Sequence, residues 1–241
     1  MRHSIGYLLL EGGAEFGGRM SEPDLLAIKL AGGVDAPICI IPTAAAPDKN
    51  HNRAGRNGVN WFESLGAKQV FTVDVINSKS ANDSALADQI RSSKLIYMLG
   101  GFTHYLGETL KESLCWSAAL EAYQNGAVIA GSSAGAMVMC EYYFDPNKQR
   151  VERGLNLVPN ACVLPHHNTF GKGWAGELRK MLPEVLLIGI DERTGMLSTD
   201  SFTDSRTIMD VEWEVHGGGG VTLYRSESTV SYGRGAKFSL K

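Results

Sequence analysis

The chain has 241 residues, of which 44% are hydrophobic and 20% charged, and its formal net charge is −3 at pH 7. This length and composition suit one globular domain with a sizeable buried core, which we place at residues 1–241. Because the net charge is small and no run of Lys or Arg exceeds two residues, we expect no nucleic acid and no membrane as partner, and a small molecule or peptide instead.

Location is predicted from two further features. The first apolar run, near the N-terminus, is too short for a membrane span and short even for the core of a secretion signal. The cysteines lack the spacing of metal ligands and lie mostly in apolar segments, so we expect them to be reduced core residues of a cytoplasmic protein. They are Cys39, Cys115, Cys140 and Cys162.

Short apolar runs recur along the chain and predict strands. Each has the length of a strand and is apolar on both faces, which is typical of a buried parallel sheet. The runs are residues 5–10, 37–42, 69–75, 94–99, 126–131, 161–165 and 185–190.

Amphipathic segments lie between these runs and predict helices. Residues 21–33 have Ser21 placed as an N-cap and end at a Gly-Gly pair, and residues 103–126 carry Leu at a spacing of four. Alternation of strand and helix predicts an α/β three-layer sandwich with a mostly parallel central sheet over about residues 1–206. From about 207 to 241, apolar and polar residues alternate between Gly-rich turns, which predicts a C-terminal antiparallel hairpin or edge ribbon.

One junction between a strand and a helix carries a G-x-S-x-G pattern, Gly131-Ser132-Ser133-Ala134-Gly135. Such a pattern is typical of a nucleophile elbow, in which a strained turn exposes one serine, here Ser133. The helix dipole and the amide of Ala134 would then stabilise an oxyanion. A small-residue turn that serves packing alone is the alternative reading.

An activated serine needs a histidine base and an acid that orients it. Of the six histidines, only His166 and His167 directly follow an apolar run, although a loop histidine can also serve as a cap or surface group. Asp191 and Glu192 follow the next apolar run and are candidate acids. The strand ends therefore predict the order Ser133, His166, Glu192.

The sequence resembles the dipeptidase E and cyanophycinase family of serine peptidases, which are relatives of class I glutamine amidotransferases. The matching segments are LLLEGG, IIPTAA (40–45), FESLGA (62–67), IYMLGGFTHYL (96–106), GAVIAGSSAGAMVM (126–139), GLNLVPNACVLPHH (154–167) and IGIDERTG (188–195). The resemblance implies a flavodoxin-like, class I glutamine amidotransferase-like fold.

Site residues follow from the same resemblance. It implies Ser133 as nucleophile, His166 as base with His167 as the alternative, and Glu192 as acid. An oxyanion hole would be formed by the amides of Gly101 and Ala134.

The implied substrate is a small peptide, with an acidic (Asp) first residue as in dipeptidase E. An acidic side chain needs a cation, for which Lys172 and Arg179 are candidates. Two features depart from the family: Phe102 follows the Gly-Gly pair where relatives carry Asn or Asp, and residues 168–182 replace the Arg-rich stretch of cyanophycinases. The candidate substrate-binding residues are Gly100, Phe102, Thr103, His167 and Arg179. No cofactor and no metal is implied, and a homodimer is a candidate assembly by analogy.

Several alternatives remain open at this stage. The chain could be a cyanophycinase-like isopeptidase, or an amidotransferase-like binding protein without turnover. An α/β-hydrolase esterase would use the order serine, acid, histidine, with His216 and one of Asp191, Asp200 or Asp210. A glutamine amidotransferase is disfavoured because its nucleophile is cysteine, and we expect Cys140 to lie along the helix that follows the turn.

Overall fold

The computed structural model describes residues 6–199 and 208–241. Its architecture is the predicted α/β class, built on two sheets. The larger sheet has the strand order β14-β11-β10-β1-β5-β4-β2-β3, in which β1, β5, β4, β2 and β3 are parallel to one another. These parallel strands are β1 (Tyr7–Glu11), β2 (Pro37–Ile41), β3 (Gln69–Thr72), β4 (Leu95–Met98) and β5 (Val128–Ser132).

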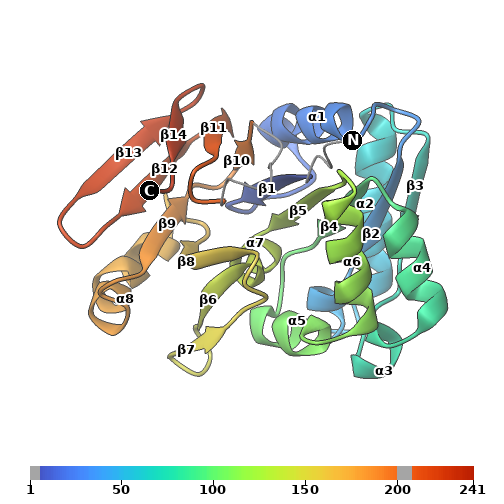
Figure 1. Ribbon diagram of the computed structural model, residues 1–241, viewed down its shortest axis with the longest axis horizontal. Helices are drawn as coiled ribbons and strands as arrows, with labels where there is room; N and C mark the ends of the chain where they lie inside the picture. The colour runs from blue at the N-terminus through green and yellow to red at the C-terminus, as the bar shows by residue number, and fades with distance from the viewer. Residues whose placement is uncertain (1–5, 200–207) are drawn as a thin grey trace.

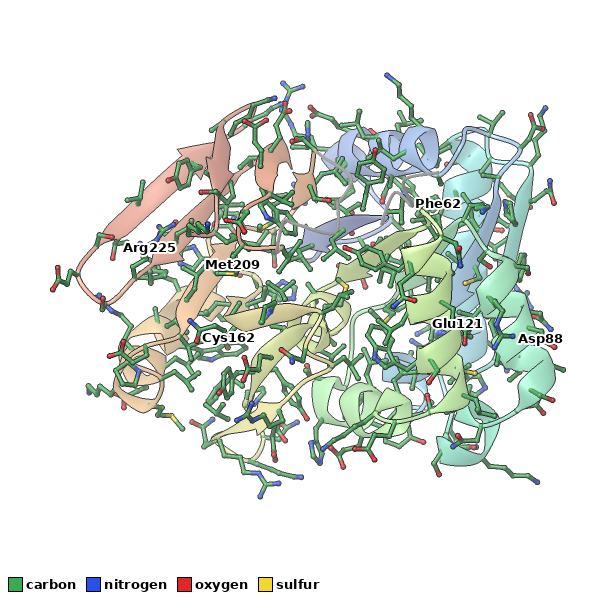
Figure 2. All side chains as sticks on the ribbon, in the orientation of Figure 1. Phe62, Asp88, Glu121, Cys162, Met209 and Arg225 are labelled. Carbon is green, nitrogen blue, oxygen red and sulfur yellow. The ribbon has the colours of Figure 1, made fainter. Side chains whose placement is uncertain are left out.

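Helices cover both faces of the parallel strands, because successive side chains of a strand point to opposite faces. Leu9 of β1 packs in one buried cluster with Ile28 and Phe62, whereas Leu8 and Leu10 pack in the other. The first face is covered by α1 (Ser21–Leu30) and α2 (His51–Ser64), and Figure 2 labels Phe62. The second face is covered by α4 (Ser84–Ser92), α5 (Thr103–Leu110), α6 (Leu114–Gln124) and α7 (Ala134–Met139), with the short α3 (Ser78–Ala81) beside them.

A charged pair links two helices of the second face. Arg91 of α4 donates a hydrogen bond to Glu121 of the neighbouring α6 at 2.5 Å, and it also pairs with Asp88. Figure 2 labels Asp88 and Glu121 on these adjacent helices. Because all three side chains are substantially exposed, this pair adds little stability and the packing of apolar side chains holds the helices.

A second sheet lies beside the first and has the order β13-β12-β9-β8-β6-β7 (Figure 1). The runs at 161–165 and 185–190 form β8 and β9, which are parallel as expected but belong to this sheet and not to the central one. Periodicity shows that a strand is buried on both faces, but it does not show in which sheet the strand pairs. The strands of the second sheet are β6 (Cys140–Asp145), β7 (Arg150–Arg153), β8 (Val158–Leu164), β9 (Leu186–Ile190), β12 (Gly220–Tyr224) and β13 (Thr229–Gly233).

The C-terminal ribbon is antiparallel, and it spans both sheets. Strand β11 (Glu212–Gly217) pairs with β10 (Thr194–Ser198), and the next strand, β12, pairs with β9 of the second sheet. The chain crosses between the sheets at Gly217, where φ is 98°. Strand β14 (Lys237–Ser239) returns to pair with β11.

Three helix boundaries differ from the sequence prediction. The segment 103–126 is two helices, because Ser113 caps a new helix by accepting a hydrogen bond from the Trp116 N–H at 3.1 Å. Ser21 is the first residue of α1 and not its cap, since a 3-10 turn (Gly18–Met20) precedes it. Helix α7 ends at Met139, so Cys140 opens strand β6 and does not lie along the helix.

Two carboxylic acids are buried near the C-terminal end of β1. The Glu11 and Asp24 side chains have no exposed surface, and one oxygen of each lacks a hydrogen-bond partner among the described residues. The other oxygens accept hydrogen bonds from Tyr97 Oη and, at 2.7 Å, from Trp61 Nε1. Burial raises the pKa of Glu11 well above its ordinary value and that of Asp24 to about 7. We expect the two groups to share one proton.

Replacing Asp24 with asparagine should therefore change how stability depends on pH. The pKa of Asp24 is about 7 in the folded chain and 3.8 ordinarily, so its contribution to stability is complete below about pH 4 and is lost as pH rises towards 7. The amide of Asp24→Asn keeps its N–H at every pH. We expect the fall in melting temperature from pH 5 to pH 8 to be smaller in the variant, by at least about 3 °C, or about 1 kcal/mol at this size. An identical pH dependence in both proteins would show that no proton is shared.

Candidate active site

Ser133 lies in a sharp turn between β5 and α7. Its φ of 48° and ψ of −107° are strained for a residue with a side chain. A Cβ atom at Gly131 would lie 2.5 Å from the carbonyl carbon of Gly135, and one at Gly135 would lie 2.3 Å from the Met98 carbonyl oxygen. Because no larger residue fits at either position, the two glycines are required by the close approach of strand, turn and helix, as the pattern predicts. Helix α7 has six residues, so its local amides matter more than its dipole.

The loop after β8 brings His166 to this serine. The Ser133 Oγ and His166 Nε2 atoms are 3.0 Å apart, within hydrogen-bond distance. The His166 backbone, at φ 50°, donates its N–H to the Gly12 carbonyl oxygen at 2.7 Å. A Cβ atom at Gly13 would lie 2.3 Å from the His166 imidazole. Gly13, which follows β1, therefore leaves the space that the imidazole occupies.

Glu192, in the turn after β9, holds the other nitrogen of the same ring. Its Oε1 lies 3.0 Å from His166 Nδ1. The backbone N–H of Glu192 donates to Asn168 Oδ1 at 2.9 Å, which ties the acid to the loop of the base. The side chains of His166 and Glu192 are 20% and 33% exposed, so solvent and a substrate can reach them. Serine, imidazole and carboxylate form one continuous chain of contacts.

The adjacent His167 lies in a different network. Its Nε2 is 2.7 Å from the Tyr224 hydroxyl and its Nδ1 is 3.3 Å from Asp191 Oδ1. It is only 5% exposed and packs against Gly189 of β9. Burial lowers the pKa of His167, and Asp191 acts in the opposite direction. The structure thus brings His166, and not His167, to the serine, and it pairs Asp191 with His167.

Two backbone amides are candidates for an oxyanion hole: that of Ala134, which follows Ser133 in the chain, and that of Gly101, which lines one cavity with Ser133. Neither the N–H of Gly101 nor that of Ala134 donates a hydrogen bond to another of the described residues. Gly101 has a φ of 137°, and a Cβ atom there would lie 2.4 Å from the Ala44 carbonyl oxygen. Free amides beside a nucleophile are suited to stabilising a developing oxyanion.

Comparison with known proteins bears on this geometry. The profile of the family described as "Peptidase family S51" matches residues 8–202. The chain belongs to peptidase family S51. This confirms the resemblance to dipeptidase E and cyanophycinase proteins.

Individual relatives of this S51 chain agree with the assignment. It is 30% identical to a protein named Cyanophycinase from Geminocystis herdmanii (strain PCC 6308), over 68% of this chain and 63% of that protein. It is 27% identical to a Cyanophycinase from Synechococcus elongatus, over 78% and 61% of the respective chains. The S51 chain therefore spans less than two thirds of the length of these curated relatives.

Solved structures extend the comparison over the whole chain. A peptidase from an acI-B1 Actinobacterium is 28% identical, with a TM-score of 0.84 over 99% of this chain and 98% of that one. A putative Peptidase E protein from Listeria monocytogenes EGD-e is 19% identical, with a TM-score of 0.60 over 95% and 99%. At that identity the second likeness shows the fold alone.

The Gly-Gly loop of the S51 chain contributes to three cavities, one of which is lined by Gly100 together with Glu15. Gly101 and Thr103 line a cavity of about 570 Å³ that also includes Ser133 and His166. Phe102 lines a neighbouring cavity of about 400 Å³. Gly100 lies on the other side of the loop, where its N–H donates to Glu15 Oε1 at 3.3 Å. Of these candidate substrate-binding residues, Gly101 and Thr103 line the cavity that includes the serine, and the Thr103 hydroxyl lies 3.6 Å from Met137 Sδ in its wall.

The candidate cations for an acidic substrate do not line the Ser133 cavity. The Arg179 guanidinium donates to the carbonyl oxygens of Arg225 and Ser226, at 3.3 and 3.1 Å, in the turn between β12 and β13. Lys172 is exposed in the 3-10 turn Gly171–Trp174. Arg179 is therefore directed to the turn between β12 and β13, and Lys172 is not among the residues that line the cavity.

Among the residues that the structure describes, the arrangement of an α/β-hydrolase esterase is not found. His216 lies on β11, where its Nδ1 is 3.5 Å from Glu22 and its Nε2 is 3.9 Å from Glu214. Asp210 pairs with Lys241, and Asp200 lies outside the described residues. His216 therefore does not serve Ser133.

Two features are absent from residues 6–199 and 208–241. Within these ranges, no group of three or more His, Cys, Asp or Glu side chains is arranged to hold a metal ion. No helix there is both long and apolar enough to cross a membrane.

Sequence reasoning missed three groups of residues around the site. The Ser132 hydroxyl donates a hydrogen bond to Glu15 Oε2 at 2.9 Å, so Glu15 holds the residue that precedes the nucleophile. Asn168 holds Glu192, and Phe170 and Trp174 line the Ser133 cavity. The position of Glu15, just after the first strand in LEGGAEF, could have indicated it, because ligands gather at the carboxyl ends of parallel strands.

Proposed function

We propose that this chain is a serine peptidase that hydrolyses small peptides through an acyl-enzyme, as one domain over residues 1–241. Ser133 is the nucleophile, His166 the base and Glu192 the acid. The observation that carries the proposal is the pair of 3.0 Å contacts that joins Ser133 Oγ to His166 and His166 to Glu192, at a strained turn.

Acylation follows from these contacts. His166 Nε2 takes the proton of the Ser133 hydroxyl as Oγ attacks the peptide carbonyl carbon. The carbonyl oxygen becomes an oxyanion, which the N–H groups of Gly101 and Ala134 stabilise. The protonated His166 then gives its proton to the leaving amine, and the peptide bond breaks.

Deacylation uses the same groups in reverse. Water gives a proton to His166 Nε2 and attacks the ester carbonyl of the acylated Ser133, and the proton then returns to Oγ. Throughout, Glu192 accepts a hydrogen bond from Nδ1–H, which holds the ring tautomer and stabilises the imidazolium.

A second candidate function is hydrolysis of isopeptide bonds, as in a cyanophycinase. The observation in its favour is the 30% identity to a protein named Cyanophycinase. Its triad chemistry would be the same. Parallel assays of peptides with ordinary linkages and of matched isopeptides joined through an aspartate side chain distinguish the two.

Covalent labelling tests the proposal and the alternative of a silent binding protein. A fluorophosphonate probe should attach in a ratio of about one per chain, at the peptide that contains Ser133, because only an activated serine reacts readily. Mass mapping identifies the site, and the Ser133→Ala variant is the control. An unlabelled wild-type chain, or a label on another residue, would overturn the proposal.

We also propose a cytoplasmic location. The four cysteines are buried and free, and burial raises the pKa of Cys39 and of Cys162 to about 12. Free, unreactive cysteines suit a reducing compartment. The homodimer and the preference for Asp remain predictions from the family resemblance.

A further inference from the structure

The cavity beside Ser133 is apolar and aromatic. Its volume of about 570 Å³ lies in the usual range for small-ligand sites. Ser133 and His166 are at its edge, and Met137, Pro146, Phe170 and Trp174 form much of its wall. A side chain next to the bond being cut would therefore enter a space bounded mainly by hydrocarbon and ring surfaces.

A row of aromatic rings begins at the base itself. The Phe170 ring stacks on the His166 imidazole, with centroids 4.7 Å apart and an angle of 26° between the planes. Trp174 packs edge-on against Phe170, with ring centroids 5.6 Å apart. It also contacts Phe144 of β6, with ring centroids 5.3 Å apart. Phe170 is 57% exposed despite these contacts. Exposed aromatic surface beside a nucleophile is available to pack against a substrate.

The row is held in place by the loop of His166. The Gly171 N–H donates to the His166 carbonyl oxygen at 3.0 Å, and a Cβ atom at Gly171 would lie 1.8 Å from the Pro165 carbonyl oxygen. Leu178 of the following helix α8 (Ala175–Met181) is fully buried and anchors it. The aromatic wall is thus part of the same rigid segment as the base.

Charge is missing where an acidic or basic side chain would need it. Among the described residues, the side chains that line this cavity include no Lys, Arg, Asp or Glu. Arg179 is directed to the turn between β12 and β13. A carboxylate or guanidinium in the cavity would lose water without gaining an ion pair, which is unfavourable.

We propose that this cavity is the subsite for a large apolar side chain, aromatic or Leu-sized, on a residue that adjoins the scissile bond. The inference rests on the proposed function and deepens it. The cavity does not supply the cation that the acidic first residue implied by the family resemblance would need. The segment 168–182, in which the Arg-rich stretch of cyanophycinases is missing, supplies both aromatic walls.

A matched peptide series tests the preference. The peptides differ only in the residue before, or only in the residue after, the scissile bond, which is Phe, Leu, Ala, Asp or Arg. For at least one of the two positions we expect kcat/KM for Phe and Leu to exceed that for Asp and Arg by at least about tenfold. The position that responds tells on which side of the bond the cavity lies. Equal or higher values for Asp or Arg at both positions would overturn the proposal.

Variants of Trp174 give a second measurement. Trp174→Ala should lower the ratio of kcat/KM for Phe to that for Ala peptides, and Trp174→Arg should raise the ratio for Asp to that for Phe peptides, each by about tenfold. Unchanged ratios in folded variants would contradict the assignment. If neither variant folds, the wild-type comparison decides.

Failure of the proposed function can be told apart from failure of this inference. Peptides bind to the Ser133→Ala variant without being cleaved, so calorimetry compares Phe and Asp peptides independently of turnover. Tighter binding of Phe peptides by an unlabelled, inactive wild type would retain the subsite and reject the enzyme. A labelled Ser133 with no preference for Phe would reject the subsite and keep the proposed function. Absence of binding of both the Phe and the Asp peptides would also overturn the subsite.

Discussion

Replacing Ser133 with alanine should lower kcat/KM for peptide hydrolysis by about 10⁵–10⁶-fold, because the variant has no oxygen to form the acyl-enzyme. The side chain is replaced by a smaller one at an existing strained turn, so the fold should be retained. The measurement is the rate of hydrolysis of the best peptide substrate, with thermal unfolding as the check on folding.

The adjacent serine is the matched control. Ser132 is fully buried, and its hydroxyl donates to Glu15 and not to an imidazole. Ser132→Ala should therefore stay within about tenfold of the wild type, since one lost hydrogen bond costs about 1 kcal/mol. Equal activity of Ser133→Ala and the wild type would remove Ser133 from the mechanism, and a dead Ser132→Ala with an active Ser133→Ala would exchange the two roles.

Replacing His166 with alanine should lower kcat/KM by about 10⁴–10⁶-fold, because the proton of Ser133 then has no base within 3.0 Å. His167→Ala should retain most of the activity of the wild type. The physical reason is that His167 contacts Tyr224 and Asp191. The pair is compared by steady-state kinetics on one peptide.

The free energy of unfolding should distinguish the two histidine variants in the opposite order to activity, with His167→Ala the less stable. Loss of the buried His167 leaves Tyr224 and Asp191 without this partner, which should cost about 1–3 kcal/mol of unfolding free energy. His166 is partly exposed, and its loss should cost less. An inactive but stable His167→Ala, together with an active His166→Ala, would contradict the assignment of the base.

Much of the fold follows from local patterns. The apolar runs of the parallel strands and the glycines around Ser133 predict the α/β class and the sharp turn, because strand periodicity and close backbone approach leave direct marks in a sequence. The assignment of β8 and β9 to a second sheet could not be predicted in this way. Pairing depends on which edges meet in three dimensions, and a run buried on both faces looks alike in either sheet.

The aromatic wall beside Ser133 also could not be predicted from the sequence. Phe170 and Trp174 lie in a segment without strand or helix periodicity, in which the family resemblance points only to the missing arginines and to Lys172 and Arg179. Their relation to His166 arises because the chain turns back after Pro165. Arg179 is a candidate cation by its position in the chain, but its long side chain reaches the carbonyl oxygens of Arg225 and Ser226 between β12 and β13.

The sequence by itself determined the small-residue turn with its nucleophile, the class of the fold and the membership in a peptidase family, because these depend on short-range sterics and on motifs that persist in linear order. Only the tertiary structure decided which of two adjacent histidines meets Ser133 and which of two adjacent acids meets that histidine. In each pair, one member joins the chain of contacts that starts at Ser133, through His166 and Glu192, and the other joins the network of His167, Asp191 and Tyr224. No local pattern states which member does which, because the direction of each side chain depends on how the two loops meet in the folded chain.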